Sequence, residues 1–566
     1  MSLTTKVELI GVVFSLGLAE LARHRRTPAL MVLWGAIAAL ATYLVGGWWL
    51  VIPAAIAVGW VGWVRWQHRS AQSTVARWNR RNTRHEGMAS RWALVWHSSA
   101  WAMKRRATVL RPTFASLTRW ERWMTTVKAY AIPVCRVGWS IRVWVPIEEV
   151  LCVFGRPRRG KTGQLIHWVI DWAGPLLVTS TKVDIYHLTH GMRAKRGPVR
   201  CFNPLELGTL PNTIAFDPLT DCADAERADE RATDLISGGV GASDGDGKRW
   251  DDQAQRVLTG FLHAAALGGH TMTDVLRWVA QPDASERQVM ALLRTSPSAY
   301  AFVPSAEQFF DTNSRTRTSV TFTIMPALAW LASTRAREAT QGAAKLDVHE
   351  LLAEHSTIYL FAEAKSRLGP LMSALAGYIS REAKRIAAQR PGGRLDPGLR
   401  LVLDEVANIC PVPLPEWTSD FGSHGISIIA AFQSRAQMVS RWGQAGARAI
   451  ANNTGATILH AYGQDTEDLE HWVTLSGHRD ELTPAGVRRV PVLTLAQLRE
   501  LPRGTVVVFP PETSPTVGRM RPGWRRWDLR RALRAEGVAA RAIVEAMEQE
   551  LIEAADEPVP VPAGDR

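Results

Sequence analysis

Cysteine is scarce in this 566-residue sequence, and its spacing matches no ligand pattern. The five cysteines lie far apart, without a CxxC motif or a cysteine and histidine at the spacing of a zinc site. This argues against a disulfide framework and a structural zinc domain, and it indicates a reducing compartment. The length allows three or four domains with large cores. A hydrophobic content of 46% excludes a wholly disordered chain.

Charged residues are absent from residues 28–64. As a single helix this run would reach roughly 55 Å, beyond a hydrocarbon core of about 30 Å, and a glycine pair followed by a proline interrupts it. These features predict a transmembrane hairpin at 28–65, whose arginine flanks place both the segment 1–27 and the later chain in the cytoplasm. The expected location is therefore the inner membrane, as a multi-pass protein. The alternative is a buried core hairpin of a soluble protein.

Acidic residues are nearly absent from the next stretch, residues 65–142. It holds 16 Lys and Arg against Glu86 and Glu121, so it carries a charge equal to the +14 of the whole chain. Within this juxtamembrane region, 66–144, arginine repeatedly adjoins tryptophan. Such pairs suit an anionic lipid membrane, which the position after the hairpin favours, and they also suit nucleic acid, where tryptophan stacks on bases. A solvated basic face over buried tryptophans is the third possibility.

A glycine-bounded loop follows an apolar run at 146–154, which reads as a buried strand. The loop, GRPRRGKT at 155–162, has the GxxxxGK[ST] spacing, and a helix is expected after it from Lys161 to Trp172. Backbone N–H groups of such a loop surround phosphate oxygens, while Lys161 reaches the terminal phosphates and the Thr162 hydroxyl binds Mg²⁺. The nucleotide-binding candidates are Gly155, Arg158, Arg159, Gly160, Lys161, Thr162 and Gly163.

A second apolar run, 399–403, ends in an acidic pair. Asp404 is expected to orient Mg²⁺, and Glu405 to polarise the attacking water. With the phosphate loop this makes a Walker A/Walker B ATPase that uses ATP and Mg²⁺. A helix cap is the alternative role for the pair.

Alternating strand and helix signals predict the fold class. Six more strands are expected at 175–180, 199–202, 357–361, 426–432, 457–460 and 506–509. The prediction is an α/β fold with a doubly wound, RecA-like P-loop sheet, formed by 145–223 and 345–515. Strand signals stop in between, so 224–344 is expected to be an inserted all-α domain. Residues 516–566 are expected to be a charged tail, with a basic helix over the arginines from 525 to 541, then an acidic stretch and a Pro-rich end. A self-neutralising, partly disordered tail is favoured over a segment that binds DNA or a secretion partner.

Several ordered motifs resemble those of one protein family. They are LDEVANI at 403–409, HGISIIAAFQSRAQM at 424–438 and NNTGATILHAYGQDTEDLEHWVTLSG at 452–477. Together with the phosphate loop they resemble a type IV secretion coupling protein of the TraG/TraD kind, within the FtsK/HerA superfamily. The resemblance covers roughly 145–510, and 403–477 is similar to the TraM-recognition region.

The resemblance implies a membrane-anchored homohexameric ATPase. Proteins of this family deliver single-stranded DNA with its relaxase, or protein substrates, to the channel components of a type IV secretion system, and a TraM-like accessory protein is a further expected partner. By the same resemblance Gln433 senses the γ-phosphate. Lys182 matches a family lysine, although Val183 stands where the family has glycine.

One position departs from the family pattern. Where the family often has an arginine that reaches a neighbouring subunit's nucleotide, this chain has Gly422. A trans-acting cation stabilises charge on the transferring phosphoryl group. Either hydrolysis is slow, or another arginine acts in trans; the nearby candidates are Arg435, Arg441 and Arg448.

Two other functions remain open from the sequence. One is an FtsK-like translocase of double-stranded DNA. The other is a nucleotide-bound hexameric scaffold that recruits substrate while another ATPase is the motor; Gly422 favours it, whereas Lys161, Asp404, Glu405 and Gln433 argue against it.

Overall fold

The computed structural model describes most of the chain after residue 86. The described residues are 87–138, 141–239, 241, 246–295, 297, 299–341, 346–364, 366–461, 465–484, 486–536 and 542–549. The predicted hairpin at 28–65 and the segment 1–27 lie outside them. Among the helices in the described ranges, none has the length and hydropathy needed to cross a membrane.

Seven parallel strands form the centre of the fold, in the order β9-β3-β8-β7-β4-β6-β5. Their side chains are almost all buried, as expected for strands covered on both faces. This part of the sheet confirms the predicted α/β class with a large parallel sheet. The strands are β3 (Val150–Phe154), β4 (Leu176–Ser180), β5 (Val199–Phe202), β6 (Thr357–Phe361), β7 (Leu399–Leu403), β8 (Ile426–Phe432) and β9 (Thr454–Leu459).

Helices cover the two faces of this sheet. On one face α9 (Lys161–Asp171) and α10 (Asp184–Arg193) bury Trp168 and Leu188 in a core shared with Val153 and Val178. The other face is equally buried and is contacted by α19, α20 and α22. The α-helices between the insertion and β12 are α18 (Val348–Ala353), α19 (Gly369–Ala388), α20 (Val406–Ile409), α21 (Leu414–Asp420), α22 (Arg435–Asn453), α23 (Thr466–Ser476) and α24 (Leu495–Arg499).

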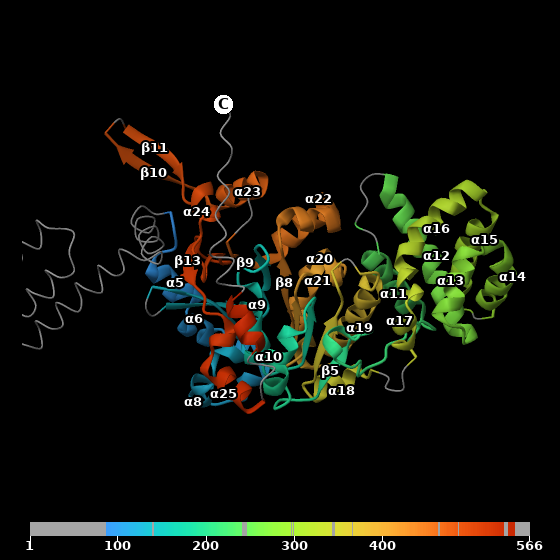
Figure 1. Ribbon diagram of the computed structural model, residues 1–566, viewed down its shortest axis with the longest axis horizontal. Coiled ribbons are helices and arrows are strands. Elements are labelled where there is room, and N and C mark those ends of the chain that lie inside the picture. The colour runs from blue at the N-terminus through green and yellow to red at the C-terminus, as the bar shows by residue number, and fades with distance from the viewer. Residues whose placement is uncertain are drawn as a thin grey trace, which may run out of the picture. The chain divides into compact units, whose positions relative to one another are not determined.

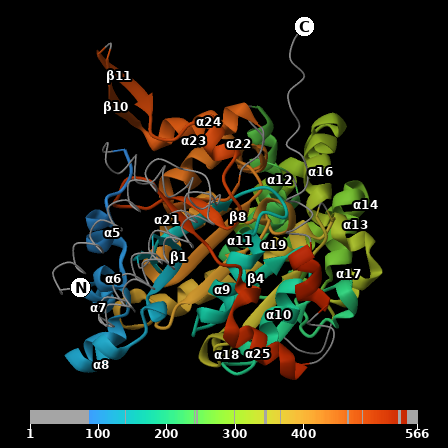
Figure 2. The ribbon, with the colours of Figure 1, turned by 60° about the vertical axis from the view of Figure 1, so that its left-hand side comes forward.

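Four antiparallel strands extend the sheet beyond β9, in the order β12-β13-β1-β2 (Figure 2). They are β12 (Thr505–Phe509), β13 (Thr516–Arg519), β1 (Ala131–Val137) and β2 (Ile141–Pro146). Of these four strands the sequence analysis predicted only β12, and it placed the whole sheet within residues 145–515. It missed β1 and β2 because arginine-rich composition hides their burial pattern, and β1 contains Pro133, which is tolerated at a break in the pairing register.

Every secondary-structure element described within 225–338 is a helix, and the other described residues there lie in short loops (Figure 1). Its interior is aromatic: Phe261 lies 5.7 Å from Phe309 and 6.2 Å from Trp278 between ring centroids. The helices are α11 (Ala225–Gly239), α12 (Asp246–Gly268), α13 (Met272–Ala280), α14 (Pro282–Leu293), α15 (Val303–Asp311), α16 (Ser314–Leu328) and α17 (Thr334–Glu338).

Two smaller parts complete the described chain. Four short helices precede β1: α5 (Arg91–Ser98), α6 (Ala100–Arg105), α7 (Ala107–Leu110) and α8 (Arg119–Met124). The strands β10 (His478–Thr483) and β11 (Gly486–Pro491) form a two-stranded hairpin separate from the main sheet (Figure 1).

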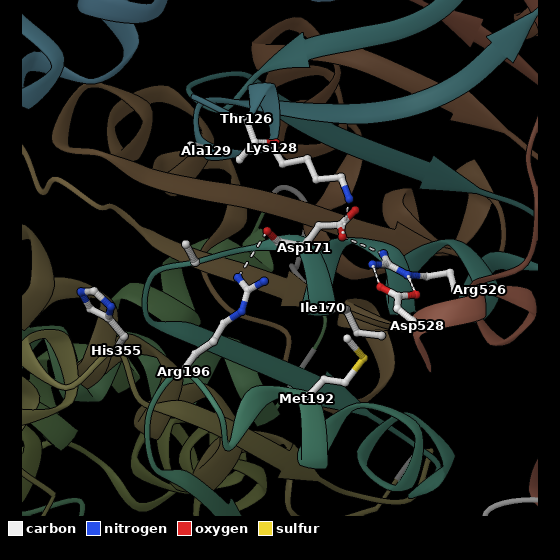
Figure 3. Close-up of a pocket in the computed structure, with 11 residues that line it drawn as sticks. Thr126, Lys128, Ala129, Ile170, Asp171, Met192, Arg196, His355, Arg526 and Asp528 are labelled. Atoms are coloured by element: carbon white, nitrogen blue, oxygen red, sulfur yellow. Dashed lines mark hydrogen bonds and ion pairs between the residues drawn. The ribbon is translucent and has the colours of Figure 1, made fainter. Parts of the chain in front are cut away.

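The C-terminal segment packs on the core, which differs from the expected charged tail. Trp524 and Leu529, the latter in α25 (Trp527–Glu536), are almost fully buried in the core that also holds α9. Figure 3 shows how charge fixes this segment: Arg526 donates to Asp171 at 2.7 Å, and Lys128 pairs with the same carboxylate at 2.8 Å. These residues line a cavity of about 500 Å³. The arginine-rich pattern indicated a helix here, but it did not reveal that the apolar face of the helix packs on the core.

Candidate functional site

The carboxyl ends of three adjacent strands bring the predicted catalytic residues together. The strands β3, β8 and β7 are parallel neighbours, so their carboxyl ends lie at one edge of the sheet. The phosphate loop leaves β3, Gln433 follows β8, and Asp404 follows β7. Strand β8 therefore places Gln433 between the two halves of the predicted ATPase motif.

Backbone conformation shapes the phosphate loop. Gly160 has φ +100° and Arg158 has φ +62°, which costs a non-glycine residue on the order of 1 kcal/mol. A Cβ on Gly155 would lie 2.7 Å from the Cβ of His460, so no side chain fits there. The loop ends at the first turn of α9, whose free N–H groups and dipole favour phosphate.

Lys161 is buried beneath the strand ends. Its Nζ donates to the carbonyl oxygen of Phe432 at 3.0 Å, and the amide of Gly155 donates to the same oxygen at 3.3 Å. Burial lowers the pKa of Lys161, while the negative charges of Asp404 and Glu405 oppose the shift. The ammonium is thus hydrogen-bonded at the end of β8, close enough to Asp404 and Glu405 for their negative charges to act on it.

Asp404 is the buried acid of the site. Burial raises its pKa to about 6, and the charge of Lys161 opposes the shift. The Thr179 hydroxyl donates to the Asp404 backbone oxygen at 3.1 Å, which fixes the end of β7. A carboxylate and the Thr162 hydroxyl are hard oxygen ligands, so these residues fit Mg²⁺.

Glu405 is held by two amide side chains. Gln433 Nε2 donates to Glu405 Oε1 at 3.2 Å, and Asn408 Nδ2 donates to Oε2 at 3.3 Å. Glu405 itself has φ +48°, an uncommon conformation for a residue with a side chain, of the kind that clusters at active sites. The structure therefore brings Gln433 and Glu405 into direct contact.

A buried pair beneath the loop was missed by the sequence reasoning. Gln164, in the first turn of α9, accepts from His460 Nε2 at 2.9 Å and donates to the Val134 carbonyl at 3.0 Å. The partners lie about 300 residues apart, so no local signal links them. The one indication was that His460 ends a predicted strand.

From the burial of His460 we predict that the free energy of unfolding falls in acid. Burial, aided by the charge of Lys161, lowers its pKa to about 3. The unfolded chain takes up this proton near pH 6.5 and the folded chain does not. This contribution to the free energy of unfolding is therefore complete above pH 6.5 and is lost as the pH falls towards 3, by about 2 kcal/mol at pH ~5.

Denaturant unfolding of the detergent-solubilised protein between about pH 7 and pH 5 would measure this slope. We expect His460→Gln to flatten it and the exposed His349→Gln to leave it unchanged. If the free energy of unfolding depended on pH equally in the wild type and in His460→Gln, the pH dependence could not be attributed to His460.

The C-terminal segment also supports the loop, which no motif indicated. A Cβ on Gly163 would lie 2.8 Å from the Trp524 ring, and one on Gly523 would lie 2.6 Å from Ile166. The His167 ring nitrogen bonds the Arg521 carbonyl at 2.7 Å. The first turns of α9 therefore rest directly on residues 521–524.

Lys182 lies after a strand that is not a neighbour of β3. It follows β4, which lies beyond β8 and β7 from β3, and its backbone N–H donates to Ser180 Oγ at 3.2 Å. Its side chain is exposed. A role for Lys182 in nucleotide binding stays a prediction.

The backbone around Gly422 explains why this position, where the family often has arginine, is glycine here. A Cβ at Gly422 would lie 2.6 Å from the Glu148 carbonyl oxygen, so this backbone excludes arginine there. Among the three candidates, Arg441 bonds the Ser237 carbonyl within its own subunit and burial lowers its pKa to about 10. Arg448 is exposed.

Comparison with known proteins shows that part of this chain is similar to a known family. Residues 398–502 match the family model described as the TraM recognition site of TraD and TraG. This range contains Asp404, Glu405 and Gln433. No curated protein matches the sequence significantly.

Solved structures of a plasmid coupling protein, TrwB, share the fold. The complex with a non-hydrolysable GTP analogue is 16% identical, covers 67% of this chain and 88% of that chain, and has a TM-score of 0.52. The complex with ADP and Mg²⁺ is also 16% identical, with 66% and 86% coverage and a TM-score of 0.52. The resemblance predicted from the motifs is therefore confirmed: the chain has the fold of the plasmid coupling protein TrwB, and residues 398–502 match the family model of the TraM recognition site of TraD and TraG.

Proposed function

We propose that this chain is a membrane-anchored ATPase that couples DNA, or a relaxase–DNA complex, to a type IV secretion channel and drives its transfer in conjugation. The observation that carries the proposal is the convergence of Lys161, Asp404, Glu405 and Gln433 at three adjacent strand ends. The TraM-recognition region in the same chain and the TrwB fold support the coupling role.

The residues divide the work of hydrolysis. ATP would supply the phosphoanhydride bond that is hydrolysed, and Mg²⁺ would neutralise part of the phosphate charge. Thr162 and Asp404 would hold the Mg²⁺ ion. Lys161 stabilises negative charge at the terminal phosphates. Glu405 orients and deprotonates the attacking water, and Gln433, bonded to Glu405, links that carboxylate to the phosphate end of the site.

The finer parts of the proposal rest on the sequence. They are anchoring in the inner membrane by the hairpin at 28–65, assembly as a homohexamer, and partners comprising single-stranded DNA, a relaxase, channel components and a TraM-like protein. The uncharged run supports the anchor, and the motif resemblance supports the others.

A second candidate function is the nucleotide-bound scaffold. The observation that favours it is the exclusion of arginine at Gly422, because the close Glu148 carbonyl removes the usual source of a trans-acting cation. The ATPase proposal then requires another arginine from the neighbouring subunit.

ATPase activity of the detergent-solubilised full chain, with and without DNA, tests the proposal. We expect turnover that single-stranded DNA stimulates severalfold, because a transfer motor couples hydrolysis to its track. Stronger stimulation by double-stranded DNA would favour the FtsK-like translocase. Nucleotide binding and oligomer formation without turnover would overturn the motor and favour the scaffold.

A further inference from the structure

Large exposed aromatic side chains concentrate on the helices that precede β1. Five of the seven exposed tryptophans in the described residues lie there, with exposed fractions from 46% to 75%. The small core of this region uses Met103, Leu110, Phe114 and Tyr130 instead. The five, which we call the tryptophan surface, are Trp92, Trp96, Trp101, Trp120 and Trp123. Figure 2 shows their helices, α5, α6 and α8, along one flank of the sheet.

The seven cations of residues 104–128 fall into two groups. Arg106, Arg111 and Lys128 pair with the acids Glu512, Asp396 and Asp171 of the main fold. Four others have no acidic partner among the described residues and, with Trp123, line a cavity of about 180 Å³. This cationic pocket is formed by Lys104, Arg105, Arg119 and Arg122.

No carboxylate neutralises the cationic pocket within the described chain. The one acid on these helices, Glu121, accepts hydrogen bonds from the Thr118 backbone N–H and hydroxyl, each at 2.8 Å. These bonds lower the pKa of Glu121 and commit its carboxylate to the start of α8. Four cations against this one carboxylate, which forms no ion pair with them, leave the pocket with a net positive charge.

Contacts between the cations and the indoles organise the surface. Lys104 Nζ lies 4.2 Å from the centre of the Trp123 ring and donates to the Trp123 carbonyl at 2.6 Å. Arg105 lies 4.9 Å from the centre of the Trp101 ring, and Trp120 stacks on Trp123 at 6.1 Å. Charge and indole are thus presented together.

We propose that the cationic pocket binds the headgroup phosphate of an anionic phospholipid, with the tryptophan surface lying in the membrane interface. Indoles prefer this boundary and Lys and Arg there attract anionic lipid. The inference rests on the membrane anchoring in the proposed function, because the surface follows the uncharged run closely in sequence. It adds a lipid site to the cytoplasmic part of the chain.

Photo-cross-linking of the full chain tests the proposal. Benzoylphenylalanine replaces Trp120, and the protein is reconstituted in nanodiscs that contain phosphatidylglycerol with a radiolabelled phosphate, in the presence of single-stranded DNA. We expect labelled protein without a large shift in mobility. The matched control is benzoylphenylalanine at Trp527, which is 76% exposed on α25 and should take up little label.

The charge requirement is tested in the same assay. The double variant Arg119→Gln/Arg122→Gln should lower labelling at least fivefold, since each cation near an anionic surface changes binding by about fivefold. Arg315→Gln, an exposed arginine of α16, should have no effect. Labelling that the double variant leaves unchanged would overturn the pocket assignment.

Other products would overturn the lipid proposal. A nuclease-sensitive adduct would make the surface a DNA site, and a band at twice the mass would make it a contact between subunits. ATPase activity measured on the same nanodiscs separates this proposal from the proposed function. Labelling without ATP turnover would support the lipid site and contradict the motor function. Turnover without labelling would support the motor function and contradict the lipid site.

Discussion

Lys161→Ala is expected to abolish both ATP turnover and conjugative transfer. The Nζ of Lys161 is buried, donates to the Phe432 carbonyl oxygen and is subject to the charges of Asp404 and Glu405, so the variant loses the cation that we expect to face the terminal phosphates. Loss of one such preorganised donor reduces turnover by about 10²–10³-fold. Transfer measured in a mating assay should fall with it.

The matched control for this variant is Lys195→Ala, because Lys195 is an exposed lysine near the end of α10. It should leave both readouts unchanged. Unchanged transfer in Lys161→Ala would defeat the conjugation role even if hydrolysis were lost, since the motor would then be elsewhere.

Glu405→Gln is expected to stop hydrolysis and keep nucleotide binding. The substitution preserves the size of the side chain and an oxygen for the bond from Gln433, but it removes the carboxylate that takes a proton from water. General bases contribute about 10²–10⁴-fold to turnover. DNA-stimulated turnover should therefore disappear while ATP still binds.

Binding of a fluorescent ATP analogue and phosphate release, measured on the same sample, would separate the two effects. Glu470→Gln, an exposed glutamate of α23, is the matched control. Normal phosphate release in Glu405→Gln would assign the base to another residue.

Local sequence patterns were sufficient to predict the parallel part of the fold. Each of its strands is a short apolar run, and β3 and β7 end in motifs whose spacing has a chemical reason. The antiparallel strands were harder to find, because β1 and β2 lie in an arginine- and tryptophan-rich stretch where composition suggested a surface. Strand pairing over long distances, such as β1 with β13, leaves no local trace.

The site was predictable to the same extent. Lys161, Asp404 and Glu405 lie in motifs, and the resemblance supplied Gln433, which the structure places in contact with Glu405. The supporting residues His460 and Trp524 were missed, because they act through packing against α9 from distant parts of the chain. Gly422 was noticed as a departure, but only the Glu148 carbonyl explains it.

The distant supports of the phosphate loop have a consequence for synthesis of the protein. The loop leaves the ribosome after about a quarter of the chain, but its neighbours β7, β8 and β9 emerge much later, and Trp524 near the end. Contacts so far apart in sequence form late in folding. The phosphate loop therefore reaches its final packing only after the chain has been synthesised beyond Trp524.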